Sequence, residues 1–248
     1  MQVLIILIIF SSFVPSIPSQ NNDSIVMDDM VLSRAQFDEW FSEHGAFRGR
    51  NSKGEEFKWK DGIVPYSINE SLGYIQRNII AQAIEDIEEV TCVRFRKATP
   101  EDKYQVHITN DRPGCFAEVG FLKKPVQTFN IYPNECSKRA VIHEFLHVLS
   151  FTHEQSASER DKYVKILMEN VADDKKHNFL KNKRDTNLGV PYDYNSIMHY
   201  SNNAFSKNNN PTIVSITDGG EVPERLVQVM SEKDILRIIR LYKCKDKL

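Results

Sequence analysis

The chain has 248 residues, which suits one domain of ordinary size preceded by extra N-terminal sequence, or two small domains. Its hydrophobic fraction of 41% is sufficient for a packed core. The formal net charge of −2 gives no excess positive charge of the kind that binds nucleic acid or an anionic membrane surface. These values argue against a nucleic-acid-binding protein and favour a soluble globular protein.

The N-terminus carries an uninterrupted apolar run from Val3 to Phe10. A membrane-spanning helix needs about 20 apolar residues, so this run is too short to cross a bilayer. Its length is typical of the apolar region of a signal peptide, with Ser16 and Ser19 as candidate cleavage positions. The alternative is a buried N-terminal strand. We expect residues 1–19 to be a signal peptide and the protein to be secreted into the extracellular space, with no stable membrane insertion.

The number of cysteines favours disulfide bonds, because an even number behind a signal peptide is typical of an oxidising compartment. Four cysteines allow three pairings, and the spacing does not choose between them. None lies in a Cys-x-x-Cys pair, so neither a cysteine zinc site nor thiol redox chemistry is expected. The four are Cys92, Cys115, Cys136 and Cys244.

The segment that follows the signal peptide reads as a pro-segment, residues 20–50. Ser33 to His44 is compatible with a short helix. The stretch Gly45 to Arg50 contains two glycines and ends in arginine, which is typical of an exposed site where a processing protease cuts. The alternative is an ordinary loop. We expect an activating protease to cut near Arg50.

From Lys58 onward the pattern is that of a folded domain. Ile63 to Ile68 reads as a strand whose proline suits a sheet edge or a strand start. Isoleucines and alanines recur at helical spacing from Ile75 to Ile87, which predicts an amphipathic helix with that face on a core. Residues 180–224 are rich in turn formers and predict irregular structure. Further strands are expected at Val93–Phe95, Val106–Ile108, Phe116–Gly120 and Thr128–Tyr132, and further helices after the capping residues Ser137 and Ser231.

The helix expected after Ser137 carries His143-Glu144-x-x-His147, and His153 follows it. Residues four apart lie on the same face of a helix, so His143 and His147 can reach one ion. His153 cannot share that face, so the helix must end near Ser150 for His153 to approach. Three neutral imidazoles with one open position are typical of a catalytic zinc site.

The five-residue motif alone is also found without metal, and the third histidine makes the longer pattern much more specific. Glu144 follows the first histidine but points to another side of the helix. It is therefore placed to reach a water on the metal and does not ligate the metal itself. Apart from the motif, this helix is almost entirely apolar, so buried histidines there need partners, which a metal supplies.

A second element, Ser196-Ile-Met-His-Tyr200, resembles the Met-turn of the astacin family of metzincin peptidases. The resemblance extends from about Asn51 to Cys244. It includes Thr91-Cys-Val-Arg-Phe95, Gly114-Cys-Phe116 ahead of Val119-Gly120, His153-Glu-Gln-Ser156, Arg160-Asp161 and Leu241-Tyr-Lys-Cys244.

The resemblance implies an α+β fold, a two-lobed metzincin-like domain over residues 51–248. A twisted mixed sheet and two long helices would form the N-terminal lobe. Mostly irregular structure and a terminal helix would form the C-terminal lobe, with the zinc cleft between the lobes.

The resemblance also implies the roles of the site residues. One Zn²⁺ per chain would be held by His143, His147, His153 and, in the resting enzyme, Tyr200. Glu144 would be the general base, and the Tyr200 hydroxyl would stabilise the oxyanion as water attacks a peptide carbonyl. Met198 would be the Met-turn methionine. Cys92 would pair with Cys244 and Cys115 with Cys136. The remaining histidines, His44, His107, His177 and His199, are interpreted as surface or structural residues.

The sequence departs from the family at several positions. Ser150 stands where the family has glycine, at a turn that favours a left-handed backbone. The family's pro-segment carries Phe-x-Gly-Asp, whose aspartate occupies the zinc, whereas Phe47 to Arg50 ends in arginine, which cannot ligate zinc. In the family, the N-terminal amine that cleavage releases reaches the glutamate after the third histidine. The resemblance therefore implies that, after a cut behind Arg50, the amine of Asn51 would reach Glu154.

The family's Gln-Ser-Arg-Pro-Asp run is also changed here, to Gln155-Ser-Ala-Ser-Glu159. Arg225 is displaced from the position associated with acidic substrates. These changes leave the preference for particular substrates open.

The leading hypothesis is an active zinc endopeptidase acting on protein or peptide substrates. The alternative is a zinc-binding protein of the same fold with weak or no turnover, suggested by Ser150 and the missing aspartate. A third hypothesis is a secreted structural protein with an accidental His-Glu-x-x-His. The sequence does not determine the substrate or the oligomeric state.

Overall fold

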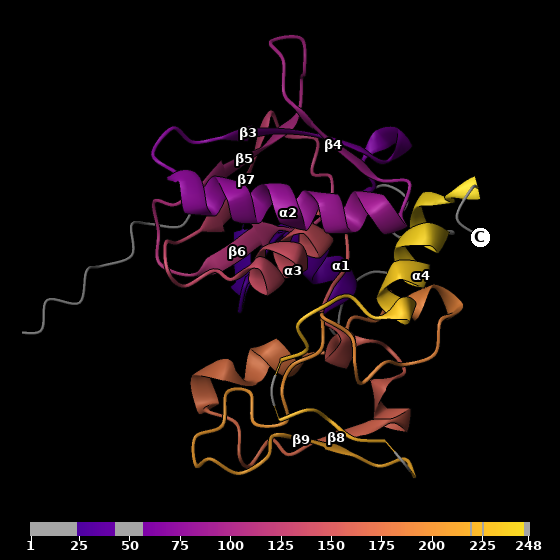
Figure 1. The fold of residues 1–248 in the computed structure, drawn as a ribbon. Coiled ribbons are helices and arrows are strands. Elements are labelled where there is room, and N and C mark those ends of the chain that lie inside the picture. The colour runs from indigo at the N-terminus through magenta and orange to yellow at the C-terminus, as the bar shows by residue number, and fades with distance from the viewer. Residues whose placement is uncertain (1–23, 43–56, 219, 225, 246–248) are drawn as a thin grey trace, which may run out of the picture.

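The computed structural model describes residues 24–42, 57–218, 220–224 and 226–245. The expected signal peptide and the stretch Phe47 to Arg50 lie outside these residues. A sheet with two helices across it forms one part of the molecule, and an irregular part with a small two-stranded sheet forms the other (Figure 1). No helix in the described part of the chain has the length and apolar character needed to cross a membrane.

The main sheet has seven strands in the order β1-β2-β6-β7-β5-β3-β4 and is of mixed type. Strand β3 is parallel to both β4 and β5, and β5 is parallel to β7, whereas β6 is antiparallel to β7. Strands β1 and β2 form an antiparallel hairpin, and β2 runs parallel to β6. The strands are β1 Ser24–Met27, β2 Met30–Ser33, β3 Ile63–Ile68, β4 Arg94–Lys97, β5 Gln105–Thr109, β6 Cys115–Glu118 and β7 Val126–Ile131.

The helices confirm the predicted starts. Ser33, Ser137 and Ser231 each cap a helix with the side chain accepting a backbone N–H of the first turn. The helices are α1 Arg34–Trp40, α2 Tyr74–Val90, α3 Lys138–Val148 and α4 Glu232–Tyr242. The helix expected over Ser33 to His44 is thus present and shorter.

The main core lies between the sheet and the pair α2 and α3. Ile80 and Ile87 of α2 and Phe145 of α3 pack with Phe129 of the sheet in one buried cluster. The prediction that Ile75 belongs to this packed face is wrong. Ile75 lies in the first turn of α2 and is 67% exposed, because the core contacts of the helix begin at Ile79.

Strand β3 lies inside the sheet, so the expected edge position for its proline is wrong as stated. The register explains how Pro65 is accommodated. Residues Ile63 to Tyr66 pair with β4, whereas pairing with β5 begins only at Tyr66. The backbone around Pro65 therefore pairs on one side only, where a missing N–H costs little.

The second part of the molecule is irregular over most of residues 180–224, as predicted. It contains the short antiparallel pair β8 Val164–Ile166 and β9 Ile213–Ser215. Its own small core includes Val171, Phe179, Tyr192 and Tyr200. The 3₁₀ helices of the fold are Lys60–Gly62, Glu154–Ser156, Arg160–Lys162, Asp173–Phe179 and Asn187–Gly189.

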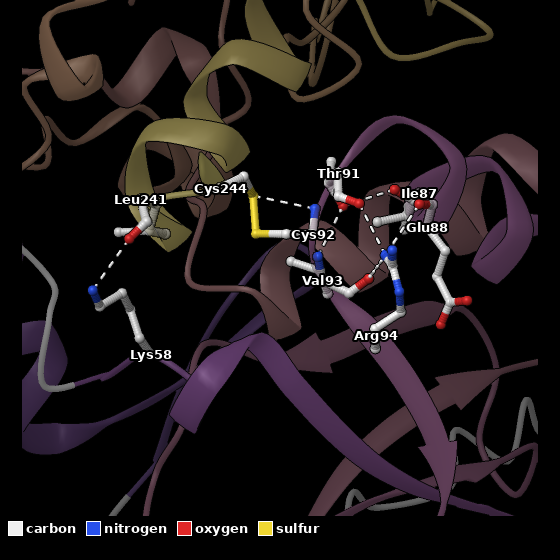
Figure 2. Close-up of a disulfide and its surroundings, with 9 residues drawn as sticks. All are labelled: Lys58, Ile87, Glu88, Thr91, Cys92, Val93, Arg94, Leu241 and Cys244. Atoms are coloured by element: carbon white, nitrogen blue, oxygen red, sulfur yellow. Dashed lines mark hydrogen bonds between the residues drawn. A yellow bond between two sulfur atoms is a disulfide. The ribbon is translucent and has the colours of Figure 1, made fainter. Parts of the chain in front are cut away.

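Two disulfide bonds have the pairing that the family resemblance implied, Cys92–Cys244 and Cys115–Cys136. The first joins the end of α4 to the residues before β4, across 152 positions of sequence (Figure 2). The Cys92 N–H also donates to Cys244 Sγ, and Lys58 Nζ donates to the Leu241 carbonyl. The C-terminal helix is thereby fixed to the sheet-bearing part.

Helix α3 ends in a reversal of the chain at Ser150, whose φ is 82°. The Phe151 N–H donates to the Leu146 carbonyl at 3.0 Å, and the Ser150 N–H donates to the His147 carbonyl at 2.8 Å. These two bonds are those of a Schellman motif, which usually has glycine at the left-handed residue. The predicted end of the helix near Ser150 is therefore confirmed, with serine in a backbone conformation that favours glycine.

Replacing Ser150 by glycine should stabilise the protein. Relief of the left-handed strain corresponds to about 1 kcal/mol, or roughly 2–4 °C in melting temperature for a domain of this size. Thermal unfolding followed by circular dichroism would measure the shift. The matched control is Ser158→Gly, at a negative φ, which should lower the melting temperature because glycine adds freedom to the unfolded chain. Equal shifts in the two variants would contradict the strain at Ser150.

Candidate active site

Helix α3 places His143 and His147 side by side in the interior. Their rings are 4.6 Å apart between centroids, and neither side chain is more than 3% exposed. The Nδ1 atom of His143 is 2.8 Å from the Ile197 carbonyl oxygen, and that of His147 is 2.8 Å from the Phe151 carbonyl oxygen. A carbonyl only accepts, so each Nδ1 carries the proton and each Nε2 presents a lone pair.

The turn at Ser150 returns the chain so that His153 joins the other two histidines. Its Nε2 lies 3.3 Å from His143 Nε2, and the side chain is fully buried. Among the described residues its Nδ1 has no hydrogen-bond partner. The structure thus brings together the three histidines that the sequence singled out.

A fourth group in this cluster, Asp29, was missed by the sequence analysis. Its carboxylate oxygens lie 3.2 Å from the Nε2 of His143, 3.2 Å from that of His147 and 2.9 Å from that of His153. An aspartate for the zinc was looked for in the sequence at Phe47 to Arg50, where arginine stands; the structure instead brings Asp29 to the histidines.

Asp29 is placed by a hairpin turn and a sheet edge. Asp28 and Asp29 connect β1 to β2, with Asp28 at a φ of 59°. The Asp29 carbonyl accepts the Ala117 N–H of β6 at 3.0 Å. The sequence signal was two adjacent aspartates between two short apolar runs, which is typical of a hairpin turn.

The donor set fits a zinc ion. The four ligand atoms lie within 4.8 Å of one another, and the three histidines are buried. Burial lowers the pKa of His143 to about 3 and also lowers the pKa of His147, so both imidazoles are neutral, as ligation requires. Two imidazole lone pairs 3.3 Å apart repel unless a cation lies between them. Three nitrogens and one oxygen match the tetrahedral preference of zinc.

Glu144 is buried beside this cluster and is 1% exposed. Its Oε2 has no hydrogen-bond partner among the described residues. Burial raises the pKa of its carboxyl well above the ordinary value; the charges of Asp29 and Asp28 add to the rise and Arg139 opposes it. A buried, unpartnered carboxyl oxygen next to a metal ligand is suited to exchange a proton with a bound reactant.

The turn Ser196 to Tyr200 forms the other side of the site. Met198 is 3% exposed and belongs to the core cluster around α3. The Tyr200 ring lies 4.6 Å from the His153 ring between centroids. The Tyr200 hydroxyl is buried beside the Asp28 carboxyl, and burial, together with the charges of Asp28 and Asp29, raises its pKa well above the ordinary value.

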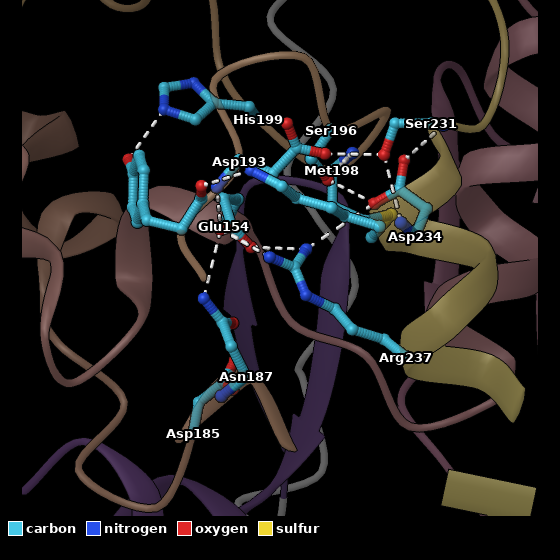
Figure 3. A network of polar contacts seen from close by, with 12 residues as sticks. Glu154, Asp185, Asn187, Asp193, Ser196, Met198, His199, Ser231, Asp234 and Arg237 are labelled. Atoms are coloured by element: carbon cyan, nitrogen blue, oxygen red, sulfur yellow. Dashed lines mark hydrogen bonds and ion pairs between the residues drawn. The ribbon is translucent and has the colours of Figure 1, made fainter. Parts of the chain in front are cut away.

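Glu154 directly follows His153 in the sequence, and both of its carboxylate oxygens have partners (Figure 3). Its Oε1 accepts from Asn187, from the Asp193 N–H and from Arg237, and its Oε2 pairs with Arg237. Asn51, whose amine was expected to reach Glu154, lies outside the described residues. Arg225 also lies outside them.

The other histidines that the structure describes, His107, His177 and His199, do not join the cluster. His199 is buried and its Nε2 lies 2.6 Å from the Tyr192 hydroxyl, and His107 Nδ1 lies 2.9 Å from Ser67 Oγ. His177 is exposed. His44 lies outside the described residues.

Arg139 is a second residue that the sequence analysis missed. It lies one helical turn before His143, and its guanidinium donates to the same Ile197 carbonyl that His143 Nδ1 contacts. The sequence signal for Arg139 was its position four residues before His143, which places the two side chains on the same face of the helix.

A buried cluster of three imidazoles, with a glutamate beside the first whose Oε2 has no partner among the described residues, is typical of zinc-dependent metallopeptidases. The family model named Astacin, which describes a peptidase family, matches residues 51–243. The chain therefore belongs to the astacin family, whose members are zinc metalloendopeptidases.

Individual relatives agree with this assignment. The chain is 38% identical over 191 residues to zinc metalloproteinase nas-13 of Caenorhabditis elegans and 39% identical over 194 residues to the low choriolytic enzyme of Oryzias latipes, in each case over 75% of this chain. Human meprin A subunit beta is 37% identical over 225 residues, or 89% of this chain. The chain spans 41% of nas-13, 30% of the meprin subunit and 68% of the low choriolytic enzyme.

A solved structure confirms the predicted α+β class. High choriolytic enzyme 1, a hatching enzyme zinc-protease from Oryzias latipes, superposes with a TM-score of 0.69 at 33% identity. The match covers 76% of this chain and 94% of that enzyme.

Proposed function

We propose that this protein is a secreted zinc endopeptidase, made as a latent precursor, that hydrolyses peptide bonds of protein substrates. The observation that carries the proposal is the convergence of His143, His147 and His153 beside the unpartnered carboxyl oxygen of Glu144. Family membership supports the reaction class. Similar proteins include zinc metalloproteinase nas-13 and a hatching enzyme zinc-protease, whose names indicate proteolysis.

The residues divide the chemistry among them. When bound by the three Nε2 atoms, zinc supplies a Lewis acid that polarises a peptide carbonyl and lowers the pKa of water toward ~7. Glu144 accepts the proton of the attacking water and passes it to the leaving amine. The Tyr200 hydroxyl donates to the developing oxyanion. The carbonyl groups of Ile197 and Phe151 fix the ring planes of His143 and His147.

In the proteolytically activated protein, replacing Glu144 by alanine should strongly reduce proteolysis and leave zinc in place, because the three histidine ligands remain. The expected loss in kcat is ~10²–10⁴-fold, the usual contribution of a general base. Casein hydrolysis and zinc content per chain are the two measurements. Glu85→Ala, on the exposed face of α2, is the matched control and should retain activity. Hydrolysis of casein by the Glu144 variant at the wild-type rate would refute the assigned role.

Replacing Tyr200 by phenylalanine removes only the hydroxyl. We expect kcat to fall about 10²-fold with little change in KM, because an oxyanion donor acts mainly in the transition state. Steady-state kinetics on a peptide substrate would measure both constants. Tyr132→Phe, at the surface, serves as the control. A change in KM alone would mean that Tyr200 binds substrate and does not act in the reaction step.

Latency is supported by the position of residues 24–42. The hairpin β1–β2 pairs with β6, and the Asp29 carboxylate lies against the three histidines, where it would take the place that a reactant needs on a bound zinc ion. Gln36 donates to the Val119 carbonyl, and Trp40 is buried, so the segment is held at several points. Cleavage near Arg50 by an activating protease would release it. The N–H groups of Ala117 in β6 and of Val119, just after that strand, would then be free to pair with an extended substrate.

Replacing Asp29 by alanine should give a precursor that cleaves casein without prior processing. We expect an increase of about tenfold or more over the wild-type precursor, since a charged contact is worth ~1.4 kcal/mol or more. The control is Asp38→Ala, on the exposed face of α1, which should stay latent. Equal activity of the Asp29 variant and the wild-type precursor would argue that the hairpin blocks the site without help from the carboxylate.

The alternative of a zinc-binding protein without turnover draws no support from the site. Ser150 adopts the left-handed backbone, and His153 lies with the other two histidines. Glu144 and Tyr200 are both present beside the cluster. The aspartate whose absence favoured that alternative is supplied by Asp29.

A further inference from the structure

A buried ion pair joins the segment behind His153 to the C-terminal helix. The guanidinium of Arg237 makes two contacts with the Glu154 carboxylate, NH2 to Oε1 at 2.7 Å and NH1 to Oε2 at 2.7 Å. The two side chains are 5% and 3% exposed. This bidentate geometry fixes the plane as well as the position of the carboxylate.

Glu154 connects the ion pair to His153 and to the segment that leads into the turn Ser196 to Tyr200. It directly follows His153, and its N–H donates to the Met198 carbonyl at 3.0 Å. Its Oε1 also accepts the Asp193 N–H at 2.7 Å, at the start of the chain that leads into the turn Ser196 to Tyr200. Movement of Glu154 would therefore shift both a ligand and the turn beneath it.

Helix α4, which carries Arg237, also supports His143, the first of the three histidines. Asp234, one turn before Arg237 on α4, accepts from Ser196 Oγ at 2.6 Å and from the Ile197 N–H at 2.8 Å (Figure 3). The Ile197 carbonyl, on the other side of that residue, contacts His143 Nδ1. Arg237 NH1 lies 3.6 Å from Asp234, so the two acidic groups share one cation.

A buried ion pair of this kind is weak evidence for stability. Removing two charges from water costs several kcal/mol per ion, and apolar residues of similar volume often give equal stability. What the pair provides instead is a single geometry, because a buried carboxylate without its cation would be strongly unfavourable in any other arrangement.

We propose that Arg237 is a positioning residue of the zinc centre, acting through Glu154 on His153 and through Asp234 on the turn that orients His143. The proposal rests on the zinc site proposed above. It assigns to α4, which contributes no ligand, the alignment of the first and third histidines. Because Glu154 has its cation within the precursor, this alignment exists before an N-terminal amine is released.

The test compares Arg237→Gln with Arg237→Lys in the full-length chain. The glutamine variant should bind zinc ~10–100-fold more weakly, as is usual when a group supporting a ligand is lost. Lysine keeps the charge but not the bidentate contact, so it should give an intermediate zinc Kd. Zinc affinity is measured by competition with a chromophoric chelator, and ligand geometry by the visible absorption of the Co²⁺-substituted protein.

The matched control is Arg240→Gln, on the exposed face of the same helix, where Arg240 donates to the Leu188 carbonyl. Its zinc Kd and Co²⁺ spectrum should equal those of the wild type within twofold. After proteolytic activation, Arg237→Gln should lose kcat at least tenfold with KM unchanged within about threefold, since geometry and not substrate contact is altered.

A purely structural role predicts a different result. The melting temperature of Arg237→Gln would then fall, while its zinc Kd and Co²⁺ spectrum, measured below the unfolding transition, would equal those of the wild type. This result would overturn the proposal. If the glutamine variant fails to fold, the lysine variant decides by the same two measurements. A wild-type chain that binds no zinc would refute the zinc site itself, whereas unchanged variants beside a zinc-binding wild type refute only the role of Arg237.

Discussion

The reversal of the chain at Ser150 is the constraint on which the rest of the site depends. A helix can present two histidines to one point but not three within eleven residues, so α3 must end between the second and the third. The Schellman bonds from Ser150 and Phe151 stop the helix within one turn of His147. The Phe151 carbonyl that the turn brings round then contacts His147 Nδ1, so one local conformation both places His153 and orients its neighbour.

The metal site is held from three directions by parts of the chain that are far apart in sequence. Helix α3 supplies two of the proposed ligands, His143 and His147, from within the main core. The C-terminal helix α4 supports the turn around Met198 through Asp234 and Arg237, and the Cys92–Cys244 disulfide fixes its far end. The hairpin at Asp29 closes the site from the sheet edge. A site built in this way is rigid before any reactant arrives, which is what electrostatic catalysis requires.

The N-terminal segment is held on the rest of the molecule by strand pairing and by apolar packing, the interactions that also hold the main sheet and its core together. Strand β2 extends the sheet beyond β6, and a small apolar cluster that includes Met27, Met30 and Trp40 packs against Val119. The exposed edge of a sheet is a ready template for another strand. Covering that edge and filling the metal site are therefore achieved by one hairpin, because Asp29 lies at its turn.

The sequence by itself determined the local features: the caps at Ser137 and Ser231, the helical spacing of His143 and His147, and the end of the helix before His153. These follow from periodicity and short-range hydrogen bonding, which a few residues specify. Only the tertiary structure decided that Asp29 meets the histidines, that Arg237 pairs with Glu154, and that β3 lies inside the sheet. Such contacts join positions that are tens to more than a hundred residues apart, and they depend on strand pairing and packing that no local pattern encodes.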